Sequence, residues 1–302
     1  GCAWNASESD KRAAAEDYDH ERAAAMKRRL IQLCAALLYN LNLKGFAEAS
    51  IYKGKSKGLC VPGLNCYSCP GAVGSCPLGT LQNALSAMDR KLPFYILGVL
   101  LLFGVTMGRT ICGFLCPFGL VQELLYRIPV PKIKKNRVTQ ELSKVKYVIL
   151  AVFVIILPVV FKAASGLPVP AFCKYICPAG TLEGGIPLVL LDDSLSGLAG
   201  ALFHWKVLVL AVILVSACFL YRSFCRILCP LGAIYSLFAP VALLGVRIDR
   251  DTCVDCGRCV RTCKMDVRQV GDRECIQCGE CMKECNVDAI YWKKPWDVKS
   301  KK

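Results

Sequence analysis

The sequence predicts an α-helical integral membrane protein with four spanning helices and an internal duplication, followed by a small α+β ferredoxin domain of the bacterial two-cluster type. Three observations predict this fold. Hydrophobic residues make up 55% of the 302 positions although the formal net charge is +15, a combination typical of apolar spans flanked by basic loops. The 21 cysteines fall mostly into regularly spaced groups. After residue 246 the apolar runs stop and a cysteine-rich segment begins.

Four apolar stretches predict the spanning helices, at about 30–48, 93–108, 146–163 and 205–221. The second and fourth reach only roughly 25 Å as helices, against roughly 30 Å of hydrocarbon, so the segments after them are expected partly within the membrane. Residues 186–202 include two Asp and are expected to form a re-entrant or interfacial hairpin.

Charge in the loops favours one orientation in the cell inner (cytoplasmic) membrane. The loop 127–146 carries seven basic residues and one acid, which places it in the cytoplasm by the positive-inside rule. The ferredoxin domain and both termini then also lie in the cytoplasm. The competing loop 44–91 carries six basic residues over a longer span.

Changes in composition divide the chain into four parts. Residues 1–26 form a polar tail, and because Met26-Lys27-Arg28-Arg29 resembles a natural start, we expect the residues before it not to be native. Residues 27–246 form the membrane domain, with repeats 27–140 and 141–246. Residues 247–292 form the double 4Fe-4S ferredoxin domain, and residues 293–302 form a basic tail.

Composition and motifs exclude several classes. The two histidines, His20 and His204, cannot provide paired haem ligands, and no C-x-x-C-H motif is present. The basic charge lies in short blocks beside apolar segments without a nucleic-acid motif, so we expect a lipid bilayer and no nucleic-acid partner. Because no G-x-G-x-x-G fingerprint occurs, partners must supply the substrate chemistry.

Two cysteine runs near the C-terminus have the spacing C-x2-C-x2-C-x3-C. Three thiolates of such a run hold three corners of a cubane cluster, and the fourth crosses to the other cluster. Gly257 and Gly279 follow the second cysteine of each run, where the chain must curl tightly. Structural zinc also takes four thiolates, but two consecutive runs with this spacing favour iron-sulfur. The predicted ligand sets are Cys253, Cys256, Cys259 and Cys285, and Cys275, Cys278, Cys281 and Cys263.

The membrane domain repeats the motif Cys-Pro-x-Gly four times, which indicates a duplicated chain. A second cysteine precedes three of the motifs by four residues. Arg109 and Arg222 stand just before the pairs of motifs two and four and are predicted to contact the cofactor. The motifs begin at Cys76, Cys116, Cys177 and Cys229, and the preceding cysteines are Cys112, Cys173 and Cys225.

Two C-x3-C pairs supply four thiolates, the number that one cubane requires. Counting helices places motifs two and four toward the cytoplasm and motifs one and three toward the outer face. We therefore expect one or two 4Fe-4S clusters in the membrane domain, besides the two of the ferredoxin domain. The inner set is Cys112, Cys116, Cys225 and Cys229, and the outer set combines Cys173 and Cys177 with two of Cys60, Cys66, Cys69 and Cys76.

Interpretations without metal stay open for some cysteines. The outer cysteines could form disulfides on an oxidising side of the membrane. The Cys-Pro-x-Gly turns could simply end helices, although four recurrences with a cysteine weigh against this. Cys34 and Cys218 are expected to be small apolar core residues.

At these residues the chain resembles the membrane polyferredoxin family with C-x3-C-P motifs and a C-terminal double 4Fe-4S ferredoxin domain. The resemblance covers residues 27–292 and rests on the double run and on Cys112-Gly-Phe-Leu-Cys116-Pro and Cys225-Arg-Ile-Leu-Cys229-Pro. Similar proteins are the ferredoxin-type membrane subunit of periplasmic nitrate reductase systems and the membrane part of the nitrous-oxide reductase regulator. The resemblance implies electron delivery from a cytoplasmic or quinol donor to an extracytoplasmic acceptor. The additional pair at Cys173 and Cys177 departs from the better-known pattern, so quinol chemistry carries over poorly.

Three functions follow from these expectations. The first is a transmembrane electron conduit from a reduced ferredoxin or flavoprotein to a membrane or extracytoplasmic reductase. Clusters at opposite faces, roughly 30 Å apart, are too distant for an efficient single hop, and the short helices ease this by drawing the motifs inward. The second is a quinol dehydrogenase with a quinone pocket, for which Glu123, Glu183 and His204 are weak proton-handling candidates. The third is a redox-sensing regulatory or assembly factor.

Overall fold

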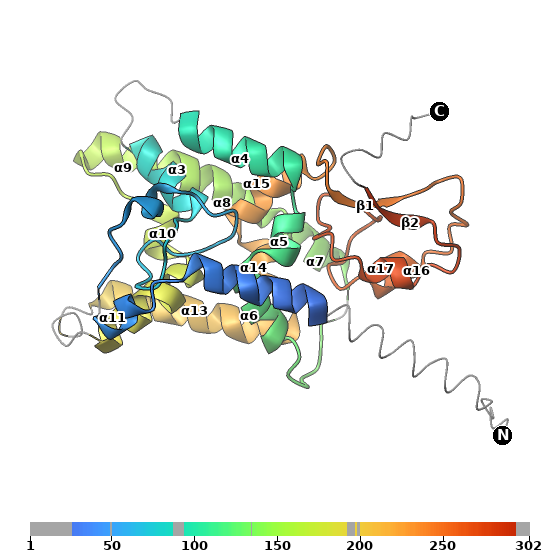
Figure 1. The fold of residues 1–302 in the computed structure, drawn as a ribbon, viewed down its shortest axis with the longest axis horizontal. Helices are drawn as coiled ribbons and strands as arrows, with labels where there is room; N and C mark the ends of the chain where they lie inside the picture. Colours follow the sequence, from blue (N-terminus) through green and yellow to red (C-terminus); the bar gives the residue numbers. More distant parts are fainter. Residues whose placement is uncertain are drawn as a thin grey trace.

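The computed structural model describes residues 26–48, 50–86, 94–133, 135–191, 197 and 200–293. The predicted N-terminal tail, except Met26, and residues 294–302 of the basic tail lie outside the described residues. Figure 1 shows a helical bundle with a small module of two strands and two short helices at one end of the long axis. The protein is therefore mostly helical and carries a ferredoxin-type domain.

The first half of the bundle contains the segments that lead to Cys-Pro motifs one and two. Residues 26–39 form a helix, which ends where the side-chain amides of Asn40 and Asn42 bond to the backbone oxygens of Ala36 and Pro70. The helix is therefore shorter than the predicted 30–48. The elements that follow are α2 (Lys44–Ala47), a 3-10 turn (Lys55–Gly58), α3 (Pro77–Ser86), α4 (Phe94–Thr106), α5 (Thr110–Phe114) and α6 (Pro117–Leu125).

The second half begins with the longest helix of the described chain. Residues Arg137–Ser165 form one helical stretch of 29 residues, with a turn at residues 143–144 and a π-helical part at Leu150–Ile156. Of the predicted hairpin at 186–202, residues 192–196, 198 and 199 lie outside the described residues. The elements are α7 (Arg137–Leu142), α8 (Val145–Ile149), α9 (Leu157–Ser165), α10 (Ala171–Tyr175), a π-helical turn (Gly180–Gly185), α11 (Ile186–Leu191), α13 (Ala201–Phe219), α14 (Ser223–Ile227) and α15 (Pro230–Phe238).

Within the described residues, two helices are long and apolar enough to cross a membrane. They are Arg137–Ser165 and Ala201–Phe219, with mean hydropathies of 2.6 and 2.2. Only 17% of the apolar window of each is buried inside the protein, unlike the core helix of a soluble protein. The stretches predicted at 30–48 and 93–108 also form helices, at 26–39 and 94–106, but these are shorter than a full span.

The terminal module is built on one antiparallel pair of strands. Strand β1 (Gly245–Ile248) pairs with β2 (Ile290–Lys293), with Gly245 opposite Lys293 and Ile248 opposite Ile290. The two cysteine runs lie between these strands, and each leads into a short helix, α16 (Arg258–Thr262) or α17 (Glu280–Lys283). The strand pair therefore closes the module as an α+β unit beside α5 and α7 (Figure 1).

Candidate metal centres

The terminal module gathers its eight cysteines around two pockets. The pocket with the larger volume, about 290 Å³, is lined by Cys253, Cys256, Cys259 and Cys285. The other, of about 20 Å³, is lined by Cys263, Cys275, Cys278 and Cys281 together with Cys259. The fourth cysteine of each run thus lies beside the first three of the other run, which is the crossed arrangement of a two-cluster ferredoxin.

Left-handed backbone residues curl each run around its pocket. Asp255 and Gly257 have φ angles of 49° and 67°, and Gln277 and Gly279, which hold the same places in the second run, have 57° and 79°. Glycine adopts this conformation at no steric cost. At Gln277 the curl turns the backbone N–H toward the Cys275 sulfur at 3.4 Å. The expectation of a tight curl at the two glycines is confirmed by these angles.

The inner membrane set lies where four short helices meet. Cys112 lies on α5 and Cys225 on α14, while Cys116 and Cys229 cap the N-termini of α6 and α15. All four side chains are buried. Electrostatic interactions connect each of the six possible pairs of these thiols. The bundle therefore brings together the four cysteines that the spacing groups.

Hydrogen-bond donors surround the inner thiols. The Gly232 backbone N–H points to the Cys229 sulfur at 3.4 Å, in the first turn of α15. The side-chain amide of Gln122 donates to the Cys225 sulfur at 3.0 Å and accepts from the backbone of Phe224. Donors of this kind stabilise thiolate and cluster negative charge.

The outer set surrounds a cavity of about 590 Å³. Four cysteines line it, Cys66, Cys76, Cys173 and Cys177. Electrostatic interactions connect Cys173 with each of the other three and Cys177 with Cys66 and Cys76. A Cβ added to Gly180 would lie 3.8 Å from the sulfurs of Cys66 and Cys177, so the glycine leaves room beside the thiols.

Gln82 supports the outer set as Gln122 supports the inner one. Its side-chain amide donates to the Cys173 sulfur at 3.3 Å and accepts from the Phe172 backbone. Each glutamine lies six residues after the cysteine of a Cys-Pro motif. Sequence reasoning missed both residues, although an alignment of motifs one and two places them at the same position.

The other described cysteines of the bundle neither belong to the inner set nor line the outer cavity, although Cys69 lies close to Cys66. Cys69 does not line the outer cavity and instead donates to the Asn40 side-chain oxygen at 3.5 Å. Cys60 lies beside Ser75 and Thr80. Cys218 is half-buried, with its thiol on the Leu214 carbonyl. Cys34 is exposed, so its prediction as a core residue is wrong, because that side of helix 26–39 faces away from the bundle.

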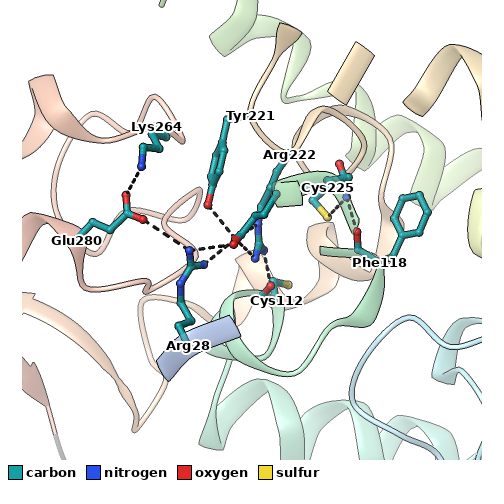
Figure 2. Close-up of polar contacts among 10 residues, drawn as sticks. Arg28, Cys112, Phe118, Tyr221, Arg222, Cys225, Lys264 and Glu280 are labelled. Carbon is teal, nitrogen blue, oxygen red and sulfur yellow. Dashed lines mark hydrogen bonds and ion pairs between the residues drawn. The ribbon is translucent and has the colours of Figure 1, made fainter. Parts of the chain in front are cut away.

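The two predicted arginines are fully buried beside the inner thiols. Arg222 donates to the Cys112 carbonyl and to the carboxylate of Glu123. The same carboxylate accepts from Arg28 at 2.6 Å and from Tyr221 at 2.9 Å. Figure 2 shows Arg28, Tyr221 and Arg222 pointing toward one another beside Cys112. The acid offsets part of the positive charge that these arginines bring to the inner site.

The inner set also lies directly against the terminal module. A Cβ on Gly113 would lie 2.4 Å from the Ile276 carbonyl oxygen, so only glycine permits this contact beside Cys112. Arg109 donates to Glu274 at 2.7 Å, and Lys146 pairs with the same carboxylate. Burial raises the pKa of Glu274, but the charges of Arg109 and Lys146 lower it more and hold it below its ordinary value.

The chemistry of these sites fits cubane clusters better than single ions. Among the residues that the structure describes, no three Cys, His, Asp or Glu side chains converge closely enough to hold one metal ion. Zinc requires four sulfurs at about 2.3 Å from one centre. In the inner site, the Nε and Nη1 atoms of buried Arg109 find no hydrogen-bond partner. Thiols in fours, a roomy outer cavity and the two unbonded nitrogen atoms of Arg109 fit an anionic 4Fe-4S cluster.

The three proton-handling candidates have other roles in the structure. Glu123 is engaged by the arginines, and Glu183 accepts the backbone N–H of Cys66 at 2.7 Å. His204 is exposed, with its ring nitrogen 3.1 Å from the Gly200 carbonyl oxygen. Two of the three therefore support the thiol sets.

Comparisons with known proteins agree with this geometry. A family described as a 4Fe-4S binding domain matches residues 75–95, 92–136, 147–186 and 202–248. An uncharacterized protein of Methanocaldococcus jannaschii is 29% identical over 56% of this chain and 64% of its own length. No solved structure matches the chain.

Two further relatives have names that concern electron transfer. YccM of Escherichia coli, named for electron transport, is 23% identical over 64% of this chain and 54% of its own length. The methylamine utilization ferredoxin-type protein MauN of Paracoccus denitrificans is 26% identical over 64% of this chain and 62% of its own length. The chain thus spans between half and two thirds of the relatives that it matches. It belongs to the polyferredoxin family, which carries repeated 4Fe-4S binding domains.

Proposed function

We propose that the protein spans the cell inner membrane and carries electrons between a cytoplasmic donor and a membrane or extracytoplasmic acceptor. The proposal includes four 4Fe-4S clusters, one in each thiol set. A bound 4Fe-4S cluster supplies a one-electron carrier that needs no substrate pocket. The donor is a reduced ferredoxin or flavoprotein, and the acceptor is a reductase.

The observation that carries this proposal is the serial placement of the four sets. The two module pockets share Cys259, so they are immediate neighbours. The pocket of Cys275 adjoins the inner set through Gly113 and Ile276. The outer set lies beyond the inner one, because α10 lies farther from the module than α5 and α14 (Figure 1). Each site therefore lies close to the next site in the series.

Exposed apolar side chains support a position in the bilayer. Large hydrophobic residues face outward along α4 and α13, among them Leu101 and Leu102 at 57% exposure and Val212 at 60%. Contiguous apolar surface of this kind marks a membrane or partner interface. Helix α4 reaches roughly 20 Å, less than the hydrocarbon thickness, so four spans require that the connecting segments complete the crossing.

The protein's own residues hold the relay in a fixed arrangement. The buried Arg109–Glu274–Lys146 cluster fixes the module against the bundle. Lys135, in the loop with seven basic residues, donates to the backbone of Val260 and Arg261 in the module. These contacts support a position of that loop and the module on one side of the membrane, and the basic charge of the loop favours the cytoplasmic side.

Proteoliposomes with trapped cytochrome c test this function. Reduced ferredoxin is added outside, and reduction of the trapped cytochrome is followed by absorbance. We expect reduction with the parent protein and none with Cys225→Ser, which lacks one inner ligand. Cys218→Ser, on the same half of the chain but outside the thiol sets, serves as the control. No reduction by parent protein that contains all four clusters would overturn the proposal.

A further inference from the structure

One irregular segment, Pro62–Cys66, runs through both membrane sites. The Leu64 backbone amide lies near the Cys116 thiol of the inner set. The next amide in the chain, of Asn65, lies near the Cys76 thiol of the outer set. Leu64, Asn65 and Cys66 also line the outer cavity. Adjacent peptide groups of this segment thus lie beside one thiol of each site.

The segment is held tightly in this position. Leu64 is 2% exposed and Asn65 is fully buried, with its side-chain oxygen accepting from Asn40 at 3.0 Å. A Cβ on Gly63 would lie 3.3 Å from the Cys116 Cα atom, so the backbones approach each other closely there. The connection therefore has a single packed conformation rather than that of a loose loop.

Tyr235 lies beside the same segment. Its hydroxyl donates to the Pro62 carbonyl at 2.9 Å, and its side chain is fully buried. Electrostatic interactions connect it with Cys112 and Cys116 of the inner set and with Cys76 of the outer set. Tyr235 stands six residues after Cys229, the place that Gln82 and Gln122 hold in motifs one and two. In motif four this place therefore holds an aromatic ring between the sites.

The contacts set a short separation between the sites. Because the two amides belong to neighbouring residues, which are about 3.8 Å apart, the Cys116 and Cys76 sulfurs beside them lie on the order of 10 Å apart. Electron tunnelling weakens exponentially with distance and is stronger through bonds and hydrogen bonds than through gaps. Two peptide groups and an aromatic ring are therefore an effective medium for electron tunnelling.

We infer that Pro62–Cys66 and Tyr235 form an electron-transfer bridge that couples the inner and outer membrane sites. The inference rests on the proposed function and names the residues that connect two of its sites. One electron crosses the bridge at a time, so one site is oxidised as the other is reduced. No bond breaks, and no proton is required by the peptide groups.

The test compares two bridge variants with a matched control in the full-length protein with its clusters. Leu64→Pro removes the backbone N–H that lies beside Cys116, and Tyr235→Leu removes the ring beside the segment. Phe238→Leu, on the same helix, removes a ring that packs on Gly104 instead. Iron per chain is measured first, and about sixteen atoms show that all four sites are loaded.

A photoreduced deazaflavin then supplies electrons, and rapid-freeze EPR follows their transfer between the inner and outer sites. We expect the rate to fall by roughly an order of magnitude or more in each bridge variant and to stay near the parental rate in Phe238→Leu. Parental rates in both loaded bridge variants would overturn the bridge. Proteoliposomes of the parent would still reduce trapped cytochrome c, so the proposed function would survive that result.

A second measurement decides the matter even where a variant fails to load iron. Two reduced sites at the inferred separation must interact magnetically. In the unaltered protein, we therefore expect the EPR signals of both reduced membrane sites to show spin-spin broadening and fast relaxation. Two independent signals without interaction would overturn the bridge.

Discussion

The inner and outer membrane sites share one framework but differ in charge and access. Each holds four thiols and a glutamine that donates to a partner sulfur. The inner thiols are all buried, and two fully buried arginines lie beside them. The outer site has an open cavity, with the carboxylate of Glu183 and the amine of Lys57 acting on Cys66.

This difference assigns separate roles to two copies of one motif. Buried positive charge favours the more negative, reduced form of a cluster, so we expect the two arginines to raise the potential of the inner site. A roomy site with half-buried cysteines is accessible to an acceptor. Duplication thus provides the framework, and in the proposed function the residues around it suit the inner copy to a relay and the outer copy to an exit.

Removing single cysteines gives the largest expected effect. Cys225→Ser should lose the inner cluster and Cys66→Ser the outer one, each at a cost of about four irons per chain. Cys218→Ser and Cys69→Ser should keep the parental content, since neither thiol lines a site. Iron analysis of the four variants, purified anaerobically, makes the comparison. Equal iron loss from Cys69→Ser and Cys66→Ser would show that the outer ligand set is assigned incorrectly.

Removing the acid of the inner site should destabilise the bundle. Glu123→Gln leaves Arg222 buried without a counter-charge and leaves Arg28 only its 3.6 Å ion pair with Glu280, and breaking such a buried pair costs about 3–5 kcal/mol. A lower Tm in detergent is expected, measured by tryptophan fluorescence. Glu141→Gln, which removes an exposed pair with Lys144, should leave the Tm unchanged. Equal Tm values for both variants would mean that the buried charges are not coupled.

A methyl group at Gly113 should loosen the contact between the bundle and the module. Gly113→Ala places a Cβ 2.4 Å from the Ile276 carbonyl, and such overpacking costs about 1–3 kcal/mol. Faster hydrogen exchange is expected in residues 245–293. Gly98→Ala is the control, because its Cβ meets nothing within 4 Å. If exchange in the module were the same in both variants, the close approach would not fix the module.

Removing the glutamine donors should have the smallest effect, on potential alone. Gln122→Leu removes the donor to Cys225, and a net hydrogen bond of about 1 kcal/mol corresponds to about 40 mV for one electron. The inner potential should fall while the outer one stays constant. Gln82→Leu should do the reverse through Cys173. EPR-monitored redox titration measures the potentials of both sites in both variants. A shift at the outer site in Gln122→Leu, or at the inner site in Gln82→Leu, would show that each glutamine is assigned to the wrong site.

The sequence predicted what depends on local spacing. The crossed cysteine sets and the curl at Gly257 and Gly279 follow from the double run, because each run wraps its pocket within a few residues. The pairing of the C-x3-C motifs followed from their repetition. Helix 26–39 was predicted too long, since the weight of Asn40 and Asn42 as helix-ending residues was underestimated.

The sequence could not predict what depends on irregular packing. A loop without sequence periodicity places Cys66 and Cys76, and not Cys60 and Cys69, at the outer cavity. The contacts of Gly63 and Gly113 form between segments that are distant in the sequence, so the spacing of the cysteine motifs does not predict them. The roles of Gln82 and Gln122 could have been predicted from the sequence, because both residues lie six positions after the cysteine of a Cys-Pro motif.

The most direct test of the account is the number of iron and acid-labile sulfide atoms in anaerobically purified protein. Four thiol sets in series require about sixteen of each per chain. A content of about eight, with the terminal module intact, would leave both membrane sites without clusters and contradict the account.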